Sequence, residues 1–187
     1  MSTSTGTITD EHQFFTGAFG LGIVLRPIGF VRHGYSDDFI RNTVGGVEGY
    51  IEILPEYADG LAMIEGFSHL IVIAYLDKVG EEARRVLRVR HRKLARLGVR
   101  IDDLPEVGVF ATDSPHRPNP LALSIVKLLA VEGNKLRVSG LDLFNGTPVL
   151  DIKPYEPSRA IKEVETPWWY RELERRAREK LGAEGPL

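Results

Sequence analysis

The feature that most constrains the fold is a series of short apolar segments that glycine and proline residues separate. The chain has 187 residues, of which 19 are glycine and 11 are proline. Short strands divided by such residues predict a β-barrel or sandwich, because βαβ units would place long helical patterns between the strands. The predicted strands span residues 28–31, 49–54, 69–76, 108–112, 123–131, 135–143 and 148–152.

The strongest local signal is the dipeptide Asn145-Gly146, which stands between the last two predicted strands. Asn-Gly supplies the two positive φ angles of a type I′ turn, so it predicts a β-hairpin here. Across such a turn, Asp142 would lie opposite Val149.

The segment 69–76 is apolar almost throughout, which predicts a strand that is buried on both faces. At its start, His69 follows Ser68, and a histidine in this position is more often a hydrogen-bonded core residue than a ligand.

The formal net charge of −2 conceals a strongly basic segment, because eight of the 24 Lys and Arg residues lie between positions 84 and 100 without an acid among them. Glu81 and Glu82 precede this segment, and its apolar residues recur at roughly helical spacing, so we expect an inserted basic helix. Its arginines either keep one face solvated or contact phosphates. The candidate nucleic-acid-binding residues are Arg84, Arg88, Arg92, Lys93 and Arg96.

Several classes of function lack support in the sequence. The chain has no cysteine, which excludes disulfides, a thiolate nucleophile and zinc–thiolate sites. Neither a dinucleotide-binding nor a phosphate-binding glycine loop is found, so a nucleotide site of these kinds lacks support. The five histidines are scattered, so we expect no metal. The longest apolar run, residues 70–76, is far shorter than the roughly 20 residues of a membrane-spanning helix. We therefore expect an intracellular protein with no membrane partner.

Two segments carry candidate functional residues. The run Ser114-Pro115-His116-Arg117-Pro118-Asn119-Pro120 must be a stiff loop, because three prolines fix φ and remove backbone donors. Arg117 and Asn119 could orient a cofactor or substrate from this loop, or Arg117 could be a structural clamp. Further along, Gly140 precedes Asp142, and a glycine in a strand often marks the close approach of a ligand or another backbone. Arg117, Asn119 and Asp142 are the candidate catalytic residues.

Four segments, in the order 26–31, 64–70, 108–120 and 140–155, resemble the TrmO family, which is also called the TsaA-like or VirR family. The resemblance implies a mainly β fold: a small closed or partly open antiparallel β-barrel, here with an inserted basic helix and a C-terminal helix at about 168–181. It divides the chain into an N-terminal extension at 1–25, a barrel domain at 26–157 and a helical extension at 158–187.

The resemblance further implies a homodimer that binds S-adenosylmethionine and methylates the N6 amine of threonylcarbamoyl-modified adenosine next to the anticodon of tRNA. An expected location in the cytoplasm agrees with that substrate. The cofactor-binding residues that the resemblance implies are Leu76, Asp77, Asp113, Ser114, Leu123, Ser139, Gly140, Leu141 and Asp142.

This chain departs from the family pattern at several positions. The family normally has arginine in place of Asp113 and frequently histidine in place of Asp77, so both differences add negative charge. The loop 34–47 also lacks the stretch with Pro and Gln that the family has there. An alternative function is therefore a divergent module that binds S-adenosylmethionine or another small ligand, with a lost or changed methyl-transfer substrate.

Overall fold

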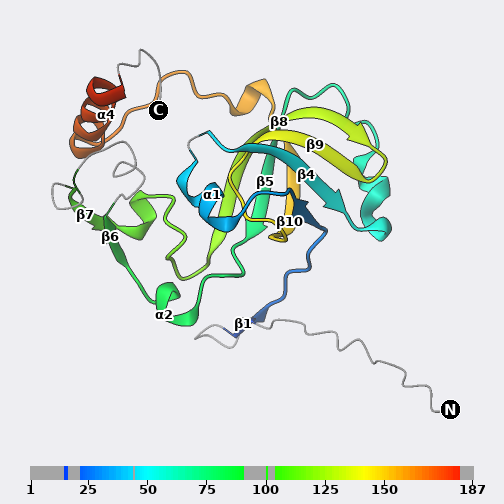
Figure 1. Ribbon diagram of the computed structural model, residues 1–187, viewed down its shortest axis with the longest axis horizontal. Coiled ribbons are helices and arrows are strands. Elements are labelled where there is room, and N and C mark those ends of the chain that lie inside the picture. Colours follow the sequence, from blue (N-terminus) through cyan, green and yellow to red (C-terminus); the bar gives the residue numbers. More distant parts are fainter. Residues whose placement is uncertain (1–14, 17–21, 44, 91–99, 101–103, 182–187) are drawn as a thin grey trace.

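The computed structural model describes residues 15–16, 22–43, 45–90, 100 and 104–181. Six antiparallel strands form a closed barrel in the order β10-β3-β4-β9-β8-β5 (Figure 1). This architecture confirms the predicted fold class. The barrel strands are β3 (Gly29–Arg32), β4 (Val47–Ile53), β5 (His69–Tyr75), β8 (Leu121–Glu132), β9 (Lys135–Leu141) and β10 (Pro148–Pro154).

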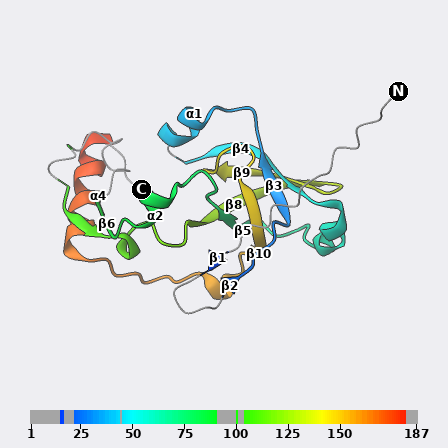
Figure 2. The ribbon, with the colours of Figure 1, turned by 90° about the horizontal axis from the view of Figure 1, so that it is seen from below.

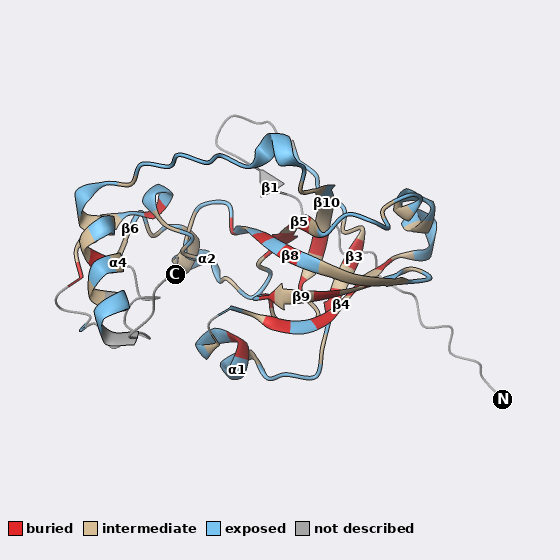
Figure 3. Ribbon diagram, turned by 90° about the horizontal axis from the view of Figure 1, so that it is seen from above, coloured by how far each residue is buried: buried red, intermediate tan, exposed pale blue. Residues whose placement is uncertain are grey.

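The barrel is filled by apolar side chains that alternate along its strands, as the two-residue period of a strand requires. Figure 3 shows this alternation as buried positions recurring along β4, β5 and β8. The inward side chains that are at most 2% exposed are Val31, Ile51, Ile53, Leu70, Val72, Ala74, Val126, Leu136, Val138, Leu141 and Val149.

Strand β5 departs from the expectation that both of its faces are buried. Leu70, Val72 and Ala74 point into the core, whereas Ile71 and Ile73 on the outer face are only half-buried. The apolar residues of β5 therefore lie on both the inner and the outer surface of the barrel.

The predicted hairpin is wrong, because β9 and β10 are not neighbours in the barrel. β9 pairs with β4 and β8, while β10 pairs with β3 and β5. A turn does form, since the Thr147 N–H donates to the Phe144 carbonyl at 3.1 Å. Among its central residues only Gly146 has a positive φ, 85°, which fits a type II turn rather than type I′. The segment between the strands thus crosses one end of the barrel, and Asp142 does not pair with Val149.

A second lobe combines the insertion between β5 and β8 with the C-terminal helix α4 (Trp168–Leu181). It holds α2 (Glu81–Arg84), the strands β6 (Arg88–Arg90) and β7 (Glu106–Gly108), and the short helix η3 (Val109–Ala111). Figures 1 and 2 show α4 beside β6 and β7, away from the barrel. Leu104, Val109 and Leu173 are at most 2% exposed and lie outside the barrel core. They give this lobe buried apolar residues of its own.

The lobe corrects two further predictions. Within the described residues, the expected basic helix is a single turn at Glu81–Arg84, and Arg88–Arg90 pairs with Glu106–Gly108 as a two-stranded sheet. Its Arg-Val-Arg alternation has the period of a strand. The part of the expected helix at 91–99 lies outside the described residues. The predicted strand at 108–112 is also wrong, because Val109–Ala111 forms a helical turn closed by a bond from the Thr112 N–H to the Val109 carbonyl. The C-terminal helix is confirmed at Trp168–Leu181.

The remaining elements are short. They are β1 (Phe15–Thr16), β2 (Gly22–Ile23), α1 (Asp37–Asn42), η1 (Pro55–Leu61) and η4 (Pro157–Arg159). Helix α1 begins after Ser36, whose hydroxyl accepts a bond from the Phe39 N–H at 3.2 Å. Within the described part of the chain, no helix combines the length and apolar character needed to cross a membrane.

Candidate functional site

The strand directions bring most of the predicted cofactor residues to one end of the barrel. β5 and β9 end there and β8 begins there, because both neighbours run antiparallel to β8. Leu76 follows β5, and its N–H donates to the Pro120 carbonyl at 2.8 Å, just before β8 starts. Three segments that are distant in sequence, 76–77, 120–123 and 139–142, therefore meet at this end.

Asp142 is fixed at this end by a serine that the sequence did not single out. The ladder between β8 and β9 has its last pair at Lys127 and Ser139. Beyond that pair, the Ser124 hydroxyl donates to Asp142 Oδ1 at 2.6 Å. Ser124 is only 6% exposed, so its hydroxyl needs this partner. A side-chain bond thus continues the link between two strands whose regular pairing has ended.

The glycine near Asp142 marks the approach of another backbone. Gly140 has φ +81°, and a Cβ added to Gly46 would lie 2.4 Å from the Gly140 carbonyl carbon. Gly46, with φ +72°, lies just before β4, whose pairing with β9 shifts register between Val47 and Gly49. Of the two alternatives for Gly140, the structure places a second backbone against it. Leu141 is fully buried, so it can offer a ligand only its backbone.

The proline-rich loop is held from within by Arg117. The guanidinium donates to the carbonyls of Ser114 at 2.8 Å and Val109 at 3.0 Å, and it also contacts the carbonyl of Thr112. Ser114 accepts a bond from the His116 N–H at 3.2 Å through its hydroxyl. These contacts favour the clamp interpretation of Arg117, whereas Asn119 is exposed at the surface of the loop.

The two predicted acidic positions are both exposed but lie in different places. Asp77 follows β5 at this end of the barrel, whereas Asp113 lies near the helix α4 of the lobe. Burial, together with the negative charges of Glu174 and Asp113, raises the pKa of Tyr170 above its ordinary value. Leu123 is 66% exposed on the outer face of β8.

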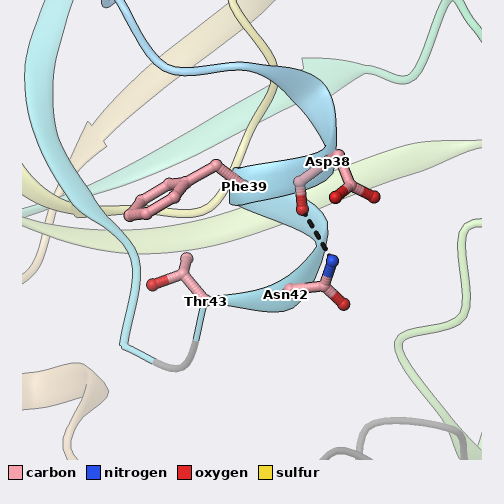
Figure 4. A pocket seen from close by; sticks show the side chains of 4 residues that line it. All are labelled: Asp38, Phe39, Asn42 and Thr43. Carbon is pink, nitrogen blue, oxygen red and sulfur yellow. Dashed lines mark hydrogen bonds between the residues drawn. The ribbon is translucent and has the colours of Figure 1, made fainter.

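An aromatic ring and two cations connect α1 with the ends of β5 and β9. The Phe144 ring has the Arg41 guanidinium 5.3 Å and the Lys78 ammonium 5.2 Å from its centroid. Lys78 also pairs with Asp37 at 2.5 Å. Since Lys78 follows Asp77 and Phe144 lies two residues after Asp142, α1 borders the predicted cofactor residues. A shallow hollow of about 470 Å³ lies on α1, lined by Asp38, Phe39, Asn42 and Thr43 (Figure 4).

Arg84, the first predicted phosphate contact, is engaged within the protein. Its guanidinium donates to the Val79 carbonyl at 3.0 Å, to Glu81 at 3.0 Å and to the Tyr75 hydroxyl at 2.5 Å. Its side chain is 16% exposed, which favours a structural role.

Of the other basic candidates, Arg88 is 68% exposed, with its Nε 3.8 Å from Glu106. Arg92, Lys93 and Arg96 lie outside the described residues. His69 is half-buried rather than in the core, with its Nδ1 3.0 Å from the Ser68 hydroxyl. The described residues contain no cluster of three or more side chains suited to a metal.

Sequence reasoning missed Ser124, Phe144 and the residues of α1. Ser124 is a polar residue at an inward position of an apolar strand, which was a usable signal. Phe144 lies in the turn that the sequence predicts for a hairpin. Its position at the barrel end follows from the strand order, which the sequence does not show.

Comparisons with known proteins show what this chain is similar to. The family model of the tRNA-methyltransferase O N-terminal domain matches residues 41–159. A probable S-adenosyl-L-methionine-binding protein of Archaeoglobus fulgidus is 42% identical over 71% of this chain and 34% of its own length. A similar protein of Pyrococcus abyssi is 35% identical over 76% of this chain and 73% of its own length.

A crystal structure of TrmO superposes with a TM-score of 0.59 at 29% identity, covering 78% of this chain and 64% of that one. The human tRNA (adenine(37)-N6)-methyltransferase is 38% identical over 60% of this chain, which spans 22% of the human protein. The chain thus covers only part of several of its relatives. Because the family model covers more than half of the 187 residues, this chain belongs to the TrmO family.

Proposed function

We propose that this protein is an S-adenosylmethionine-dependent methyltransferase that acts on the N6 amine of adenosine in tRNA. The observation that carries the proposal is the convergence of segments 76–77, 120–123 and 139–142 at one end of a TrmO-family barrel. Relatives named as tRNA (adenine(37)-N6)-methyltransferases support the reaction, and relatives named as S-adenosyl-L-methionine-binding proteins support the cofactor.

The residues at this end suit the chemistry of the cofactor. S-adenosylmethionine carries a positive sulfonium, an ammonium and a ribose diol, and carboxylates can pair with each of these groups. Asp142, fixed by Ser124, and the exposed Asp77 supply carboxylates at this end, while Lys78 supplies a cation for the methionine carboxylate. When bound, the cofactor supplies an electrophilic methyl group on sulfur.

The protein's own contribution is to position the two reactants and to exclude water from between them. The short bond from Ser124 limits the rotation of Asp142, and the Arg117 clamp stiffens the loop that leads into β8. The finer proposal is that the target adenosine carries a threonylcarbamoyl group next to the anticodon, as the family resemblance implies. We also propose that the protein acts in the cytoplasm, where its tRNA substrate is made.

We propose that the protein is a homodimer joined through the outer face of β5 and β8. Leu121, Leu123 and Ile125 on this face are 39%, 66% and 50% exposed. They lie opposite Tyr75, Ile73 and Ile71 in the neighbouring strand. Apolar side chains gathered on an exposed sheet face are typical of an interface. A second copy would also account for the apolar outer face of β5.

The proposed dimer is tested by measuring its dissociation by analytical ultracentrifugation for Leu123→Asp. The expected result is a shift to monomer, because the charge would be buried without a partner. Met63→Asp is the matched control, since Met63 is 91% exposed and lies in the segment between β4 and β5. A Leu123→Asp variant with the wild-type mass would exclude this interface.

The reaction is tested with purified protein, S-adenosylmethionine and tRNA, followed by mass spectrometry of the nucleosides. Comparing tRNA with and without the threonylcarbamoyl group shows whether the substrate is any adenosine at this position or only the modified one. Asp142→Asn, measured by calorimetry, should weaken cofactor binding. If the protein binds the cofactor tightly yet forms no methylated nucleoside with either tRNA, the alternative of a divergent binding module takes the place of the enzyme. Exposed acids at positions 77 and 113 favour that alternative.

The boundaries 1–25, 26–157 and 158–187 stay a proposal for the domains. The buried contacts of Leu104 and Leu173 suggest that the C-terminal extension belongs with the insertion between β5 and β8. Limited proteolysis tests this arrangement, because the insertion and α4 should then become resistant to protease together.

A further inference from the structure

Three aromatic rings form a ladder from the segment after β3 to the first turn of α1. The rings of His33 and Tyr35 have centroids 5.7 Å apart, and Tyr35 stacks on Phe39 at 5.1 Å with an angle of 16° between the planes. Tyr35 and Phe39 are 43% and 51% exposed. Near-parallel rings that remain half exposed form a preorganised stacking surface.

The base of the ladder is fixed by hydrogen bonds. His33 Nε2 lies 2.9 Å from the Leu143 carbonyl, and the Tyr35 N–H donates to His33 Nδ1 at 3.2 Å. The His33 N–H donates to Asn145 Oδ1 at 3.1 Å, which ties the ladder to the segment that closes the barrel end. The outer ring, Phe39, stands at the first turn of a helix capped by Ser36. Little ordering is therefore needed before a flat ligand can stack.

The surroundings of the outer ring suit a nucleobase. Figure 4 shows the Phe39 ring and the Thr43 side chain on one side of α1, with the Asp38 and Asn42 side chains on the other. The Thr43 hydroxyl can donate to or accept from the edge of a base. The hollow of about 470 Å³ lined by these residues has room for one base.

A cation near the outer ring suits an RNA ligand. Arg41 is exposed on the same helix, with its guanidinium over Phe144. Of the two acids of α1, Asp37 is paired with Lys78, and Asp38 lies on the side of the helix away from the Phe39 ring (Figure 4). A cation beside an aromatic surface can hold the phosphate of a nucleotide whose base is stacked. The predicted cofactor residues lie on β8 and β9 and in the segments next to the strands, whereas the ladder is formed by His33 and Tyr35 before α1 and by Phe39 within it.

From these contacts we infer that His33, Tyr35 and Phe39 form a stacking platform for an unstacked base of the RNA substrate, with Phe39 as its contact surface. Single-stranded loops are the usual targets of this mode of recognition, because their bases can turn away from the stack. The inference rests on the proposed function only in taking RNA as the substrate.

The test measures the affinity of an anticodon stem-loop RNA by fluorescence anisotropy and the affinity of S-adenosylmethionine by calorimetry. Phe39→Ala should weaken RNA binding by about 5- to 150-fold, the loss expected for one stacked base. Phe39→Trp should retain the affinity, and Tyr35→Ala should reduce it by removing the support of the ring. Because Phe39 carries no charge, the salt dependence of RNA binding should keep its slope in Phe39→Ala.

The matched control is Phe67→Ala. Phe67 is 38% exposed and precedes β5 at the opposite end of the barrel, so its loss should leave both affinities unchanged. Wild-type RNA affinity in Phe39→Ala would overturn the inference. A loss of cofactor affinity measured without RNA would also overturn it, because the ring would then hold the adenine of the cofactor.

The outcome also separates this inference from the proposed function. If the wild type methylates tRNA and Phe39→Ala keeps the same KM for tRNA, the platform is refuted and the enzyme stands. If the wild type binds RNA without methylating it while Phe39→Ala loses affinity, the platform stands and the proposed reaction fails. If the wild type binds no RNA, both are refuted.

Discussion

The substitution Arg117→Ala distinguishes between two roles of Arg117, that of a structural clamp and that of a cofactor contact. The Arg117 guanidinium reaches three backbone carbonyls, those of Val109, Thr112 and Ser114, within the loop that joins the lobe to β8. Removing it leaves the carbonyls of Thr112 and Ser114 without this donor, whereas the Val109 carbonyl keeps its bond from the Thr112 N–H. A hydrogen bond to a charged group contributes about 1.5–3 kcal/mol. Since solvent replaces part of three such bonds, we expect the free energy of unfolding to fall by about 2–4 kcal/mol.

The loss is measured by urea unfolding, followed by both circular dichroism and tryptophan fluorescence. For a chain of this size it corresponds to a decrease in Tm of roughly 5–15 °C. Arg117→Lys should recover only part of the stability, because an ammonium cannot reproduce the planar fork of donors. Arg159→Ala, at an exposed position in η4, is the control. An Arg117→Ala variant with unchanged stability and weakened cofactor binding would refute the clamp.

Three further predictions concern packing and charge. Gly46→Ala should destabilise the protein by more than about 2 kcal/mol, because its Cβ would lie 2.4 Å from Gly140, whereas Gly45→Ala, with nothing within 4 Å, should cost less in the same urea titration. Leu173→Ala should loosen the lobe by about 2–5 kcal/mol, and hydrogen exchange should then rise in α4 and β7 but not in the barrel. Arg175 and Arg176 lower the pKa of Glu172 from 4.5 to about 2, so its stabilising effect is present above pH 4.5 and is lost as the pH falls toward 2. Far-UV ellipticity of Glu172→Gln should lack that part of the acid transition, and an identical transition in both proteins would contradict the assignment.

The strands of the barrel could be predicted from the sequence because each carries its own pattern. The segments that became β4, β8, β9 and β10 were all found, with their ends displaced by a few residues. Alternation and turn residues are local properties, so one sequence is enough to reveal them. The order of the strands around the barrel is not local, and Asn145-Gly146 therefore gave a real turn but the wrong partner strands.

In the basic segment, the local pattern predicted the wrong secondary structure for Arg88–Arg90. The glutamates ahead of it and its leucines favoured a helix, and a helical turn does form at Glu81–Arg84. Farther along, Arg88–Arg90 pairs with Glu106–Gly108, which lies beyond the predicted helix. A partner strand that distant cannot be recognised from the segment alone. Propensity yields to tertiary pairing when both patterns fit.

The sequence proposes candidate site residues, but physical contacts decide what they do. The family resemblance selected Asp142 and the proline-rich loop selected Arg117, yet neither gave a reason to notice Ser124, which donates to Asp142 at 2.6 Å. The sequence also could not show that the Arg117 guanidinium forms its hydrogen bonds with carbonyls of its own loop. These assignments depend on register across two strands and on the path of a loop, which become visible only in three dimensions.

The acidic residue at position 113 illustrates how an appended helix can change a family position. The family normally has arginine there, whereas this chain has Asp113 near the C-terminal helix, where its charge helps to raise the pKa of Tyr170. α4 also covers Leu104 in the insertion through Leu173. A charged residue close to α4 interacts electrostatically with that helix as well as with any bound ligand. The exchange of arginine for Asp113 is thus coupled to the lobe, and its effect on cofactor binding must be measured with α4 in place.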